Sequence, residues 1–444
     1  MPPLLVGLFF AIAFVFLGNI ICKKTEADQS TYTYICFLSG LNSVYTLVLT
    51  GIPLPFIISL LWAALVLSGL FYLYKRQRWP FKIASSFLWL ILLSAPFLYI
   101  LCVQPIYNWD ARSIWFFHGK ILYYAHRLGN HIGFERALSI GYDAHMDYPK
   151  LVSSLSALAA QTIGFWNEYI PKASLVTLFL LGLIGLSSLR ILSLASKSML
   201  LTAWIIITYY NAPGQTMDAW LSFYSMLSVL FFLEFFEYKE SSSFACCIIT
   251  SLLLLSLKNE GNAIFIILII LYASIFYIQR STVRLCMEFK QDWLIYLIAL
   301  IPIILWETRK IEMRLHVDLD LYSSNALEHL SSRANLSTVY EFSYYLFYVC
   351  NLFLTPLTIC FAIILPSLFS IQRIWKIKIF RYSIIIASSF FLMYTLTLSW
   401  VYFTTHHEFT WHLANSAIRV IQPIKLIGFV PLALFFSVRE KIRG

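Results

Sequence analysis

Long, uninterrupted apolar runs recur along the whole chain. A helix that crosses a bilayer needs about 20 predominantly apolar residues, and thirteen segments of this kind can be marked. Each is predicted to be a helix, because a helix satisfies its own backbone hydrogen bonds in lipid. The runs do not alternate between polar and apolar residues, which excludes a transmembrane β-barrel. The thirteen segments lie near residues 3–22, 32–50, 54–74, 83–103, 172–190, 198–213, 217–236, 243–259, 262–279, 291–307, 342–368, 382–402 and 420–438.

The composition agrees with a membrane protein. Of the 444 residues, 60% are hydrophobic and only 12% are charged, whereas soluble domains carry about 25% charged residues. We therefore predict an all-α, polytopic transmembrane helical bundle that forms a single integral membrane domain over residues 1–444. Its expected parts are four N-terminal spans (1–103), an outer loop with juxtamembrane helices (104–171), six spans (172–307), a second outer loop (308–341) and three C-terminal spans (342–444).

The basic residues predict an orientation. Of the 32 Lys and Arg residues, 19 fall in short loops or in the C-terminal tail on one side of this thirteen-span scheme. Short loops rich in Lys and Arg mark the cytoplasmic side, so we expect the N-terminus outside and the C-terminus inside. The net charge of +10 then reflects orientation and contact with anionic lipid. No basic run lies on a soluble segment, so nucleic acid is not an expected partner.

One apolar segment does not fit the scheme. Residues 148–165 could span the membrane, but counting them as a span would invert every later loop against the charge rule. We expect them to form a helix that lies at or dips into the outer leaflet. Residues 110–127, if helical, are expected to form an amphipathic helix on the membrane surface.

The most informative polar stretch follows the fourth predicted span. Asp110 lies between Trp109 and Arg112 at the expected membrane boundary. A carboxylate placed there could act as a general base on an acceptor hydroxyl. The alternative is an interfacial belt, in which Trp and Tyr are common and Asp110 only caps a helix.

The same predicted loop ends in a second polar group. His145, Asp147 and Tyr148 come shortly before Pro149 and Lys150. His145 and Asp147 could bind a substrate or a metal, but two such residues are a weak metal signal, and solvated loop residues are the alternative. The eight cysteines include no Cys-x-x-Cys pair, so no zinc site is predicted.

Two further charged positions are expected on the same face. Asp218 begins the seventh predicted span, where it could also serve as a helix N-cap. Lys258 and Glu260 interrupt an apolar stretch of about 35 residues. Charges this deep are costly in lipid, so they must lie in a turn or face a polar cavity.

The last outer segment precedes the final span. Glu408 and His412 are four residues apart and would share one face of a helix. Arg419 enters the final span from outside, and its planar guanidinium could bind a phosphate. The alternative for Arg419 is that its side chain extends to the interface to reach water.

In this order, the motifs resemble the bacterial branch of the GT-C superfamily of membrane glycosyltransferases. The relevant members are the dolichyl-phosphate-mannose-protein mannosyltransferase-like and aminoarabinose-transferase-like enzymes. Asp110, in WDARSIWFFHGK, is similar to the acidic residue of their first outer loop, and HMDYPKLVSSLSAL resembles their loop-end motif. Asp218, in MDAWL, resembles their second acidic position; KNEG and WHLANSAIR resemble motifs of uncharacterised bacterial members. The resemblance covers roughly residues 100–425.

The sequence also departs from that family pattern. Three helices precede the span that leads into the loop of Asp110, where many members have none. Asp110 is not part of an Asp-x-Asp or Asp-Glu pair, and Lys150 stands after Pro149 where relatives often have Pro or Leu. We therefore assign no metal ligands and no certain cofactor, while a divalent cation remains an open alternative.

The resemblance implies a function. It implies transfer of a sugar from a polyprenyl-phosphate-linked donor to a lipid, glycan or protein acceptor, with inversion, at the outer face of a bacterial inner (cytoplasmic) membrane. It implies Asp110 as general base, Asp218 as the group that orients the acceptor or a cation, and Arg419 with Lys258 as the groups that neutralise the lipid phosphate. The remaining substrate-binding candidates are Glu260, His145, Asp147, Tyr148, His412 and Arg112.

Other functions stay open at this point. A transporter or flippase of lipid-linked saccharide would need polar residues at mid-membrane depth and broken helices in paired halves. An O-antigen polymerase or ligase type of enzyme would use Arg and His in a late outer loop, and segment 308–341 contains Arg309, Arg314, His316 and Arg333. A purely structural membrane subunit is the simplest alternative.

Overall fold

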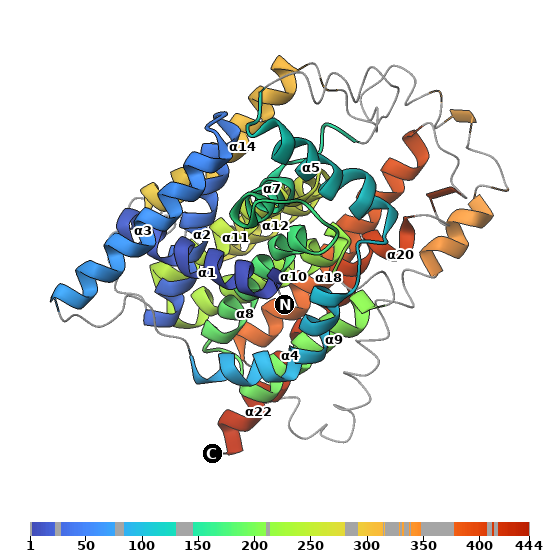
Figure 1. Cartoon of the computed structure of the whole chain (residues 1–444). Coiled ribbons are helices and arrows are strands. Elements are labelled where there is room, and N and C mark those ends of the chain that lie inside the picture. Colours follow the sequence, from blue (N-terminus) through green and yellow to red (C-terminus); the bar gives the residue numbers. More distant parts are fainter. Residues whose placement is uncertain are drawn as a thin grey trace.

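The described part of the chain is all-helical. The computed structural model describes residues 2–22, 28–75, 84–129, 145–209, 214–279, 292–313, 315, 328, 331–332, 337, 339–347, 377–405, 411–412 and 416–443. Over these residues it contains helices and no strand. Figure 1 shows the helices gathered into one bundle, with α10 near its centre and α3 at its edge.

The helices follow the apolar runs of the sequence. The first four are α1 (Pro2–Ile21), α2 (Gln29–Leu49), α3 (Leu54–Lys75) and α4 (Ser85–Val103). A π-helical turn η1 (Ala111–Trp115) then leads to α5 (Phe116–Ala125) and α7 (Leu151–Ile163). The central part contains the 3-10 turn η2 (Ile170–Lys172), α8 (Ala173–Ser188), α9 (Leu194–Tyr209), α10 (Met217–Tyr238), α11 (Ser241–Leu257), α12 (Glu260–Ile278) and α14 (Trp293–Glu312). The last part contains α18 (Lys378–Thr404), α20 (Ala417–Val420), α21 (Gln422–Gly428) and α22 (Val430–Arg443).

Within the described residues, nine helical segments are long and apolar enough to cross a membrane. This finding indicates a multi-pass integral membrane protein. The nine segments are Pro2–Ile21, Gln29–Leu49, Leu54–Tyr74, Ser85–Val103, Ile170–Ser188, Met217–Tyr238, Glu260–Ile278, Lys378–Thr404 and Ala417–Val438.

The other four of the thirteen predicted spans are not confirmed. Segments 198–213 and 243–259 correspond to α9 and α11, which are apolar helices of only 16 and 17 residues. Segment 291–307 corresponds to α14, whose last turns carry charged side chains. Most of segment 342–368 lies outside the described residues.

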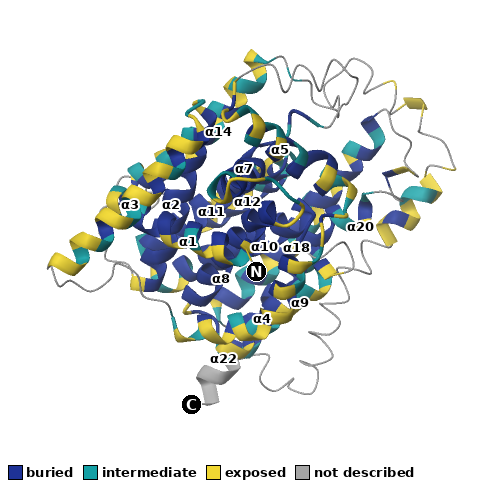
Figure 2. Cartoon of the chain, viewed as in Figure 1, coloured by how far each residue is buried: buried dark blue, intermediate teal, exposed yellow. Residues whose placement is uncertain are grey.

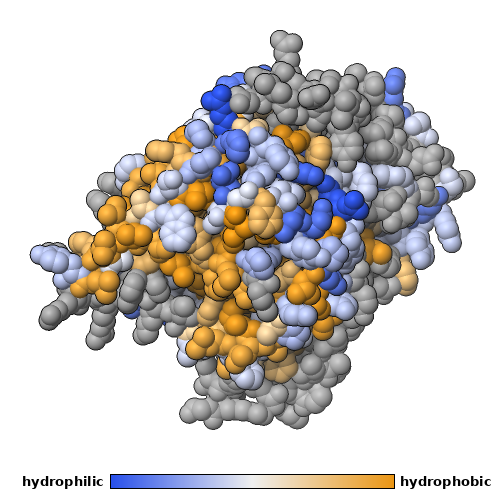
Figure 3. Space-filling view, viewed as in Figure 1, coloured by the Kyte–Doolittle hydropathy of each residue, from blue (hydrophilic) through white to orange (hydrophobic). Residues whose placement is uncertain are grey.

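Burial separates central from peripheral helices. The spans that contain α8 and α10 are each 94% buried, whereas that of α3 is only 22% buried. Figure 2 shows this contrast as buried helices around α8 and α10 and an exposed α3. The exposed side chains of α3 include Trp62, Leu67 and Phe71, and Figure 3 shows a largely hydrophobic surface over this part of the molecule. Apolar residues on the outside are expected where lipid rather than water is the solvent.

Two glycines allow α1 and α2 to cross closely. A Cβ atom on Gly18 would lie 1.8 Å from the carbonyl oxygen of Cys36, and one on Gly40 would lie 2.1 Å from that of Phe14. Each glycine therefore admits the backbone of the other helix. Small residues are the usual means of close helix packing in membranes.

The apolar segment 148–165 contains α7, which is covered by other parts of the protein. The first ten residues of α7 are all buried, and the helix packs against α5, α8 and η2. Gly119 of α5 explains part of this burial, because its Cα lies so close to α7 that a Cβ would meet the Ser153 oxygen and Ser156 at 3.0 Å. The structure therefore places α7 inside the protein, where α5 covers it.

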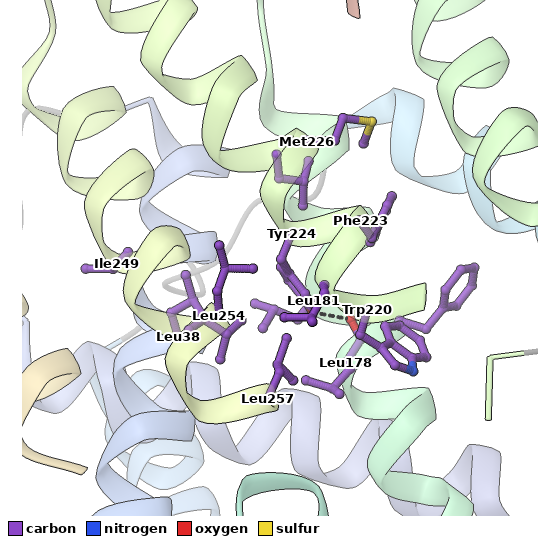
Figure 4. Close-up of a cluster of buried hydrophobic side chains, with 14 of the residues drawn as sticks. Leu38, Leu178, Leu181, Trp220, Phe223, Tyr224, Met226, Ile249, Leu254 and Leu257 are labelled. Carbon is purple, nitrogen blue, oxygen red and sulfur yellow. Dashed lines mark hydrogen bonds between the residues drawn. The ribbon is translucent and has the colours of Figure 1, made fainter. Parts of the chain in front are cut away.

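The core directly beneath the polar residues joins α8, α10 and α11. Trp220 and Tyr224 of α10 pack with Leu254 and Leu257 of α11, as Figure 4 shows. The Tyr224 hydroxyl donates a hydrogen bond of 2.6 Å to the carbonyl oxygen of Leu178. This packing fixes the N-terminal end of α10 relative to the C-terminal end of α11.

The other end of α10 carries a separate charged group. Glu234 is fully buried and accepts a hydrogen bond of 2.7 Å from the backbone N–H of Arg190, while the Arg190 guanidinium pairs with Glu240. Asp218 lies at the start of this 22-residue helix, about 24 Å from Glu234 along the axis at the rise of an α-helix. Arg190 and Lys239 belong to loops that the sequence predicts to be cytoplasmic. These loops lie at the end of α10 that is opposite to Asp218.

Candidate functional site

Asp110 and Arg419 form an ion pair at the end of the bundle. The Nη1 atom of Arg419, on α20, donates to the Oδ2 atom of Asp110, which immediately precedes η1. The two side chains are 23% and 18% exposed, so the pair is largely covered and still open to one side. Two candidates that the sequence placed in different outer segments are thereby joined.

The segment before Asp110 is held against the start of α10. The Oε1 atom of Gln215 accepts hydrogen bonds from the backbone N–H groups of Tyr107 (3.1 Å) and Asn108 (3.2 Å). Its Nε2 atom donates to the carbonyl oxygen of Pro105 at 3.1 Å. Gln215 stands three residues before Asp218, so its amide fixes the Asp110 segment next to the second acidic position.

Asp218, Lys258 and Glu260 form a second charged group. Lys258 Nζ lies 3.0 Å from Asp218 Oδ1 and 2.7 Å from Glu260 Oε1. The Lys258 and Asp218 side chains are 7% and 3% exposed. Burial alone would lower the pKa of Lys258, but the two carboxylates outweigh it and raise that pKa well above its ordinary value. Lys258 therefore stays charged throughout the physiological pH range.

Each of these two carboxylates keeps one oxygen without a partner. Asp218 Oδ2 and Glu260 Oε2 are buried and accept no hydrogen bond from the described residues. A buried carboxylate oxygen without a donor is costly, and such costs are concentrated at functional sites. The two oxygens therefore retain unused hydrogen-bond acceptor capacity within the described residues.

The two charged groups belong to one electrostatic cluster. The guanidinium of Arg419 interacts with Asp218 and Glu260 as well as with Asp110. We call these five residues, Asp110, Asp218, Lys258, Glu260 and Arg419, the charged cluster. Asp110 immediately precedes η1, Asp218 lies on α10, Lys258 directly follows α11, Glu260 begins α12 and Arg419 lies on α20.

Three stacked rings lie next to the charged cluster. Trp115 stacks on Tyr148 with centroids 5.3 Å apart, and Tyr148 stacks on His145 at 5.0 Å. Burial, together with the charge of Glu260, raises the pKa of Tyr148 well above its usual range. The phenol is therefore a hydrogen-bond donor at neutral pH. His145 adopts a left-handed backbone conformation, with φ of 50°, which is uncommon for a residue other than glycine.

Asp147 joins the aromatic residues to the charged cluster. Its side chain is buried, and its Oδ2 atom accepts a hydrogen bond from the Nδ2 atom of Asn259. Asn259 stands between Lys258 and Glu260. The sequence candidates Asp147 and Tyr148 thus lie beside Lys258 and Glu260, although more than 100 residues separate them.

The Lys150 side chain fixes the backbone of residues 145–150 by hydrogen bonds. Its fully buried Nζ atom donates to the carbonyl oxygens of Met146 (2.8 Å) and Tyr148 (2.9 Å) and lies 3.0 Å from His118 Nδ1. Its own backbone N–H donates to the Tyr45 hydroxyl at 3.0 Å. The departure from the family pattern at this position therefore has a structural role that fixes Asp147 and Tyr148.

His412 is linked to the charged cluster through Tyr402. Its ring stacks on Tyr402 at 4.5 Å, and its Nε2 atom lies 2.6 Å from Thr405 Oγ1. Tyr402 and Tyr394, both buried on α18, interact electrostatically with Asp218 and Glu260. Glu408, the expected helix partner of His412, lies outside the described residues.

Arg112 is a sequence candidate with an exposed side chain and is not a member of the charged cluster. Its side chain is exposed on η1. The neighbouring residues Ala111 and Ser113 are buried, so the turn directs Arg112 away from the protein interior.

The described residues contain no group of three or more His, Cys, Asp or Glu side chains that could hold a metal ion. Within the charged cluster, Asp218 and Glu260 are the two carboxylates that Lys258 Nζ contacts. The donor set is therefore two carboxylates with an ammonium group already between them.

Sequence reasoning missed several residues at this site. Gln422, one turn after Arg419, is fully buried, and neither its amide nitrogen nor its amide oxygen has a hydrogen-bond partner among the described residues. A polar residue three positions after Arg419 in an apolar span was a usable signal. Tyr394 and Tyr402 are eight residues apart and therefore share one face of α18, which was a second usable signal. Gln215 and Lys150 gave no comparable signal.

Comparison with known protein families, with curated proteins and with solved structures found no match to this chain.

Proposed function

We propose that this protein is a membrane glycosyltransferase. It moves a sugar from a polyprenyl-phosphate-linked donor to a lipid, glycan or protein acceptor at the extracytoplasmic face of a bacterial inner membrane. The fold we propose is of the GT-C type, with the unconfirmed predicted spans completing thirteen and with the N-terminus outside and the C-terminus inside. The resemblance of the motifs to that superfamily supports both proposals.

One observation carries the proposal. Asp110, Asp218, Lys258, Glu260 and Arg419 come from four distant parts of the chain and form one cluster at the N-terminal end of α10. The resemblance implies catalytic or phosphate-binding roles for four of them, and Glu260 is a further substrate-binding candidate. Convergence of carboxylates and cations at the rim of an apolar bundle suits a substrate that is both lipid-borne and charged.

The proposed reaction is a single displacement. Asp110 accepts the proton of the acceptor hydroxyl, the acceptor oxygen forms a bond to the anomeric carbon, and the bond from that carbon to the phosphate oxygen breaks. The polyprenyl phosphate leaves with the electron pair, and the configuration inverts. A positioned general base contributes about 10²–10⁴-fold to a rate, and cations near a leaving phosphate stabilise its developing charge.

The ion pair couples donor binding to the base. Without donor, Arg419 contacts Asp110. The donor phosphate is a diester with one negative charge, like the carboxylate, and its oxygens suit the planar guanidinium, so an arriving donor phosphate competes with Asp110 for Arg419. The Asp110 oxygen that this competition releases is then available to the acceptor hydroxyl.

The transfer assay tests the base. Membranes that contain the wild-type protein or Asp110→Asn receive polyprenyl-phosphate hexose labelled in the sugar, and transfer to acceptor is measured. We expect Asp110→Asn to lower the initial rate by about 10²–10⁴-fold. Glu240→Gln is the matched control, because Glu240 also pairs with an arginine but at the other end of α10. Full activity of Asp110→Asn at normal expression would overturn the role of Asp110.

The orientation needs its own experiment. A compartment-sensitive reporter is fused after residue 129, close to α5, and in a second protein after residue 239, at the end of α10. We expect the first reporter outside and the second inside. A cytoplasmic reporter after residue 129 would show that the charged cluster faces inward and would contradict the proposal.

One observation favours a second candidate function. The last apolar segment is divided into α20, α21 and α22, and broken helices are typical of secondary transporters. The charged residues argue against a transport site, because Asp218 and Lys258 lie at helix ends rather than at mid-helix. Movement of labelled lipid-linked saccharide across a proteoliposome membrane without sugar transfer would favour the transporter.

A further inference from the structure

A lysine side chain lies between two carboxylates of the charged cluster, of which Asp218 is buried and Glu260 is 22% exposed. Lys258 Nζ contacts both Asp218 Oδ1 and Glu260 Oε1 at hydrogen-bond distance. The two oxygens therefore face each other across a single nitrogen atom. Oxygen atoms of one or two carboxylates are also what Mg²⁺ takes from a protein in phosphate-handling sites.

The turn that carries Lys258 is tightly built. Lys258 has an extended backbone, with φ of −161°, directly after α11, and its carbonyl oxygen accepts the N–H of Gly261 at 2.9 Å. A Cβ on Gly261 would lie 2.0 Å from the Leu254 carbonyl oxygen. Only glycine fits there, so the turn returns the chain closely enough for Lys258 and Glu260 to meet.

The electrostatics require a cation at this position. Two carboxylates that share a buried site repel each other, and burial without compensation is costly for each. Arg419 contributes to the balance, but its guanidinium already contacts Asp110. The remaining positive charge between Asp218 and Glu260 is the ammonium of Lys258.

We propose that Lys258 is a built-in cation that occupies the place of a divalent metal ion between Asp218 and Glu260. The native site therefore works without a divalent ion. Removal of the ammonium group creates a site for Mg²⁺ or Mn²⁺, to which Asp218 Oδ2 and Glu260 Oε2, the two oxygens without partners, become additional ligands. The proposal rests on the proposed function only where sugar transfer is measured.

The first test measures binding without substrate. Full-length wild-type protein and Lys258→Ala are purified in detergent, treated with EDTA and unfolded thermally in MgCl₂, MnCl₂ or NaCl of equal ionic strength. We expect the wild-type midpoint to be the same in all three salts. We expect Lys258→Ala to show a saturable upward shift, on the order of a few degrees, in MgCl₂ or MnCl₂ alone.

Two further variants make the result decisive. Lys258→Ala/Asp218→Asn removes one carboxylate and is expected to lose the response to Mg²⁺ and Mn²⁺. Lys258→Gln, whose amide can still donate to Asp218, replaces Lys258→Ala if that variant does not fold, and it should show the same saturable shift. Equal shifts in the wild type and in the lysine variant, or no shift in the variant, would overturn the proposal.

Sugar transfer provides a separate result. We expect wild-type transfer to be unchanged by EDTA, and we expect Mg²⁺ or Mn²⁺ to restore part of the rate that Lys258→Ala loses. A wild-type enzyme that stops after EDTA treatment and recovers with Mg²⁺ would overturn the built-in cation. If no protein transfers sugar but the thermal shifts follow the expectation, the glycosyltransferase proposal fails while the built-in cation stands.

Discussion

The guanidinium of Arg419 contacts the carboxylate of Asp110 across 309 residues of sequence. One residue precedes the π-helical turn η1 and the other belongs to the short helix α20, near the C-terminus. Their contact connects the segment that follows α4 to the last apolar segment. The pair is largely buried, so it contributes to the fold as well as to the site.

A double-mutant cycle on this pair should show strong coupling. Arg419→Gln leaves the Asp110 carboxylate largely buried without its cation, and Asp110→Asn removes the carboxylate that the guanidinium contacts. We expect each variant to unfold at a lower temperature and the double variant to lose less than the sum, with a coupling of about 1–3 kcal/mol. The measurement is thermal unfolding of the four proteins in detergent.

The Arg309–Glu312 pair provides the comparison. It lies on one helix at 2.8 Å and is more exposed, with side chains 31% and 53% exposed. Pairs of this kind couple by about 0.3–0.5 kcal/mol. Equal coupling in the two cycles would contradict a special role of the Asp110–Arg419 contact.

The crossing of α1 and α2 should tolerate no added methyl group. Gly18→Ala and Gly40→Ala each place a Cβ against backbone of the other helix, which forces the helices apart, because backbone cannot turn aside as a side chain can. We expect losses of at least about 1–3 kcal/mol, seen as lower unfolding midpoints and lower membrane yield.

Gly69 of α3 is the matched control for this prediction. A Cβ at Gly69 meets nothing within 4 Å, and alanine is the better helix former. Gly69→Ala should therefore leave the midpoint unchanged or raise it slightly. Equal unfolding midpoints for Gly18→Ala, Gly40→Ala and Gly69→Ala would contradict the prediction that the crossing of α1 and α2 requires glycine.

Lys150 should make stability depend on pH. Burial, the largest cause, lowers the pKa of Lys150 well below its ordinary value of 10.5, although the charge of Asp147 partly opposes this effect. Between the lowered pKa and 10.5, the folded protein binds fewer protons at this group than the unfolded chain does. Stability therefore rises with pH in that window, by at most about 1.4 kcal/mol per pH unit for this group.

The measurement compares unfolding midpoints between about pH 7.5 and about pH 9.5, above the ordinary titration range of histidine. We expect the wild-type midpoint to rise over this range and that of Lys150→Met to rise less. Lys120→Met, on the exposed side of α5, should retain the wild-type slope. Identical slopes for Lys150→Met and the wild type would contradict the prediction.

Gln422 should show opposite effects on stability and activity. A fully buried amide without a partner among the described residues costs about 1–3 kcal/mol, so Gln422→Leu is expected to raise the unfolding midpoint. Residues retained at such a cost usually serve function, and Gln422 lies one turn from Arg419. We expect Gln422→Leu to raise the KM for polyprenyl-phosphate hexose. A more stable variant with an unchanged KM would contradict a role of Gln422 in donor binding.

The helices were largely predictable, and the reason is local. Whether a segment enters lipid depends on the summed hydropathy of about 20 consecutive residues, a quantity that the sequence contains directly. This reasoning located α1 to α4, α8, α10, α12 and α18 within a few residues. It did not reveal that protein covers α7, where Ser153 and Ser156 donate hydrogen bonds to neighbouring segments.

The site was predictable as a set of residues but not as an arrangement. Asp218, Lys258 and Glu260 stood out because charge is rare in this chain, where 12% of residues are charged. The backbone at the turn between α11 and α12 places Lys258 between Asp218 and Glu260, and the backbone of η1 leaves Arg112 exposed. Neither direction could be predicted from the sequence. Gln215, Tyr394 and Tyr402 join the site only because α10 and α18 present those faces.

The sequence by itself determined that this chain forms membrane helices and that its few charges stand at the ends of those helices, because partition into lipid is a property of each segment alone. Only the tertiary structure decided which charges meet. The contacts between Asp110 and Arg419, and between Asp147 and Asn259, join residues that are distant in the chain. Such contacts depend on how closely helices cross, and the crossings are set by glycines and buried side chains whose partners lie on other helices.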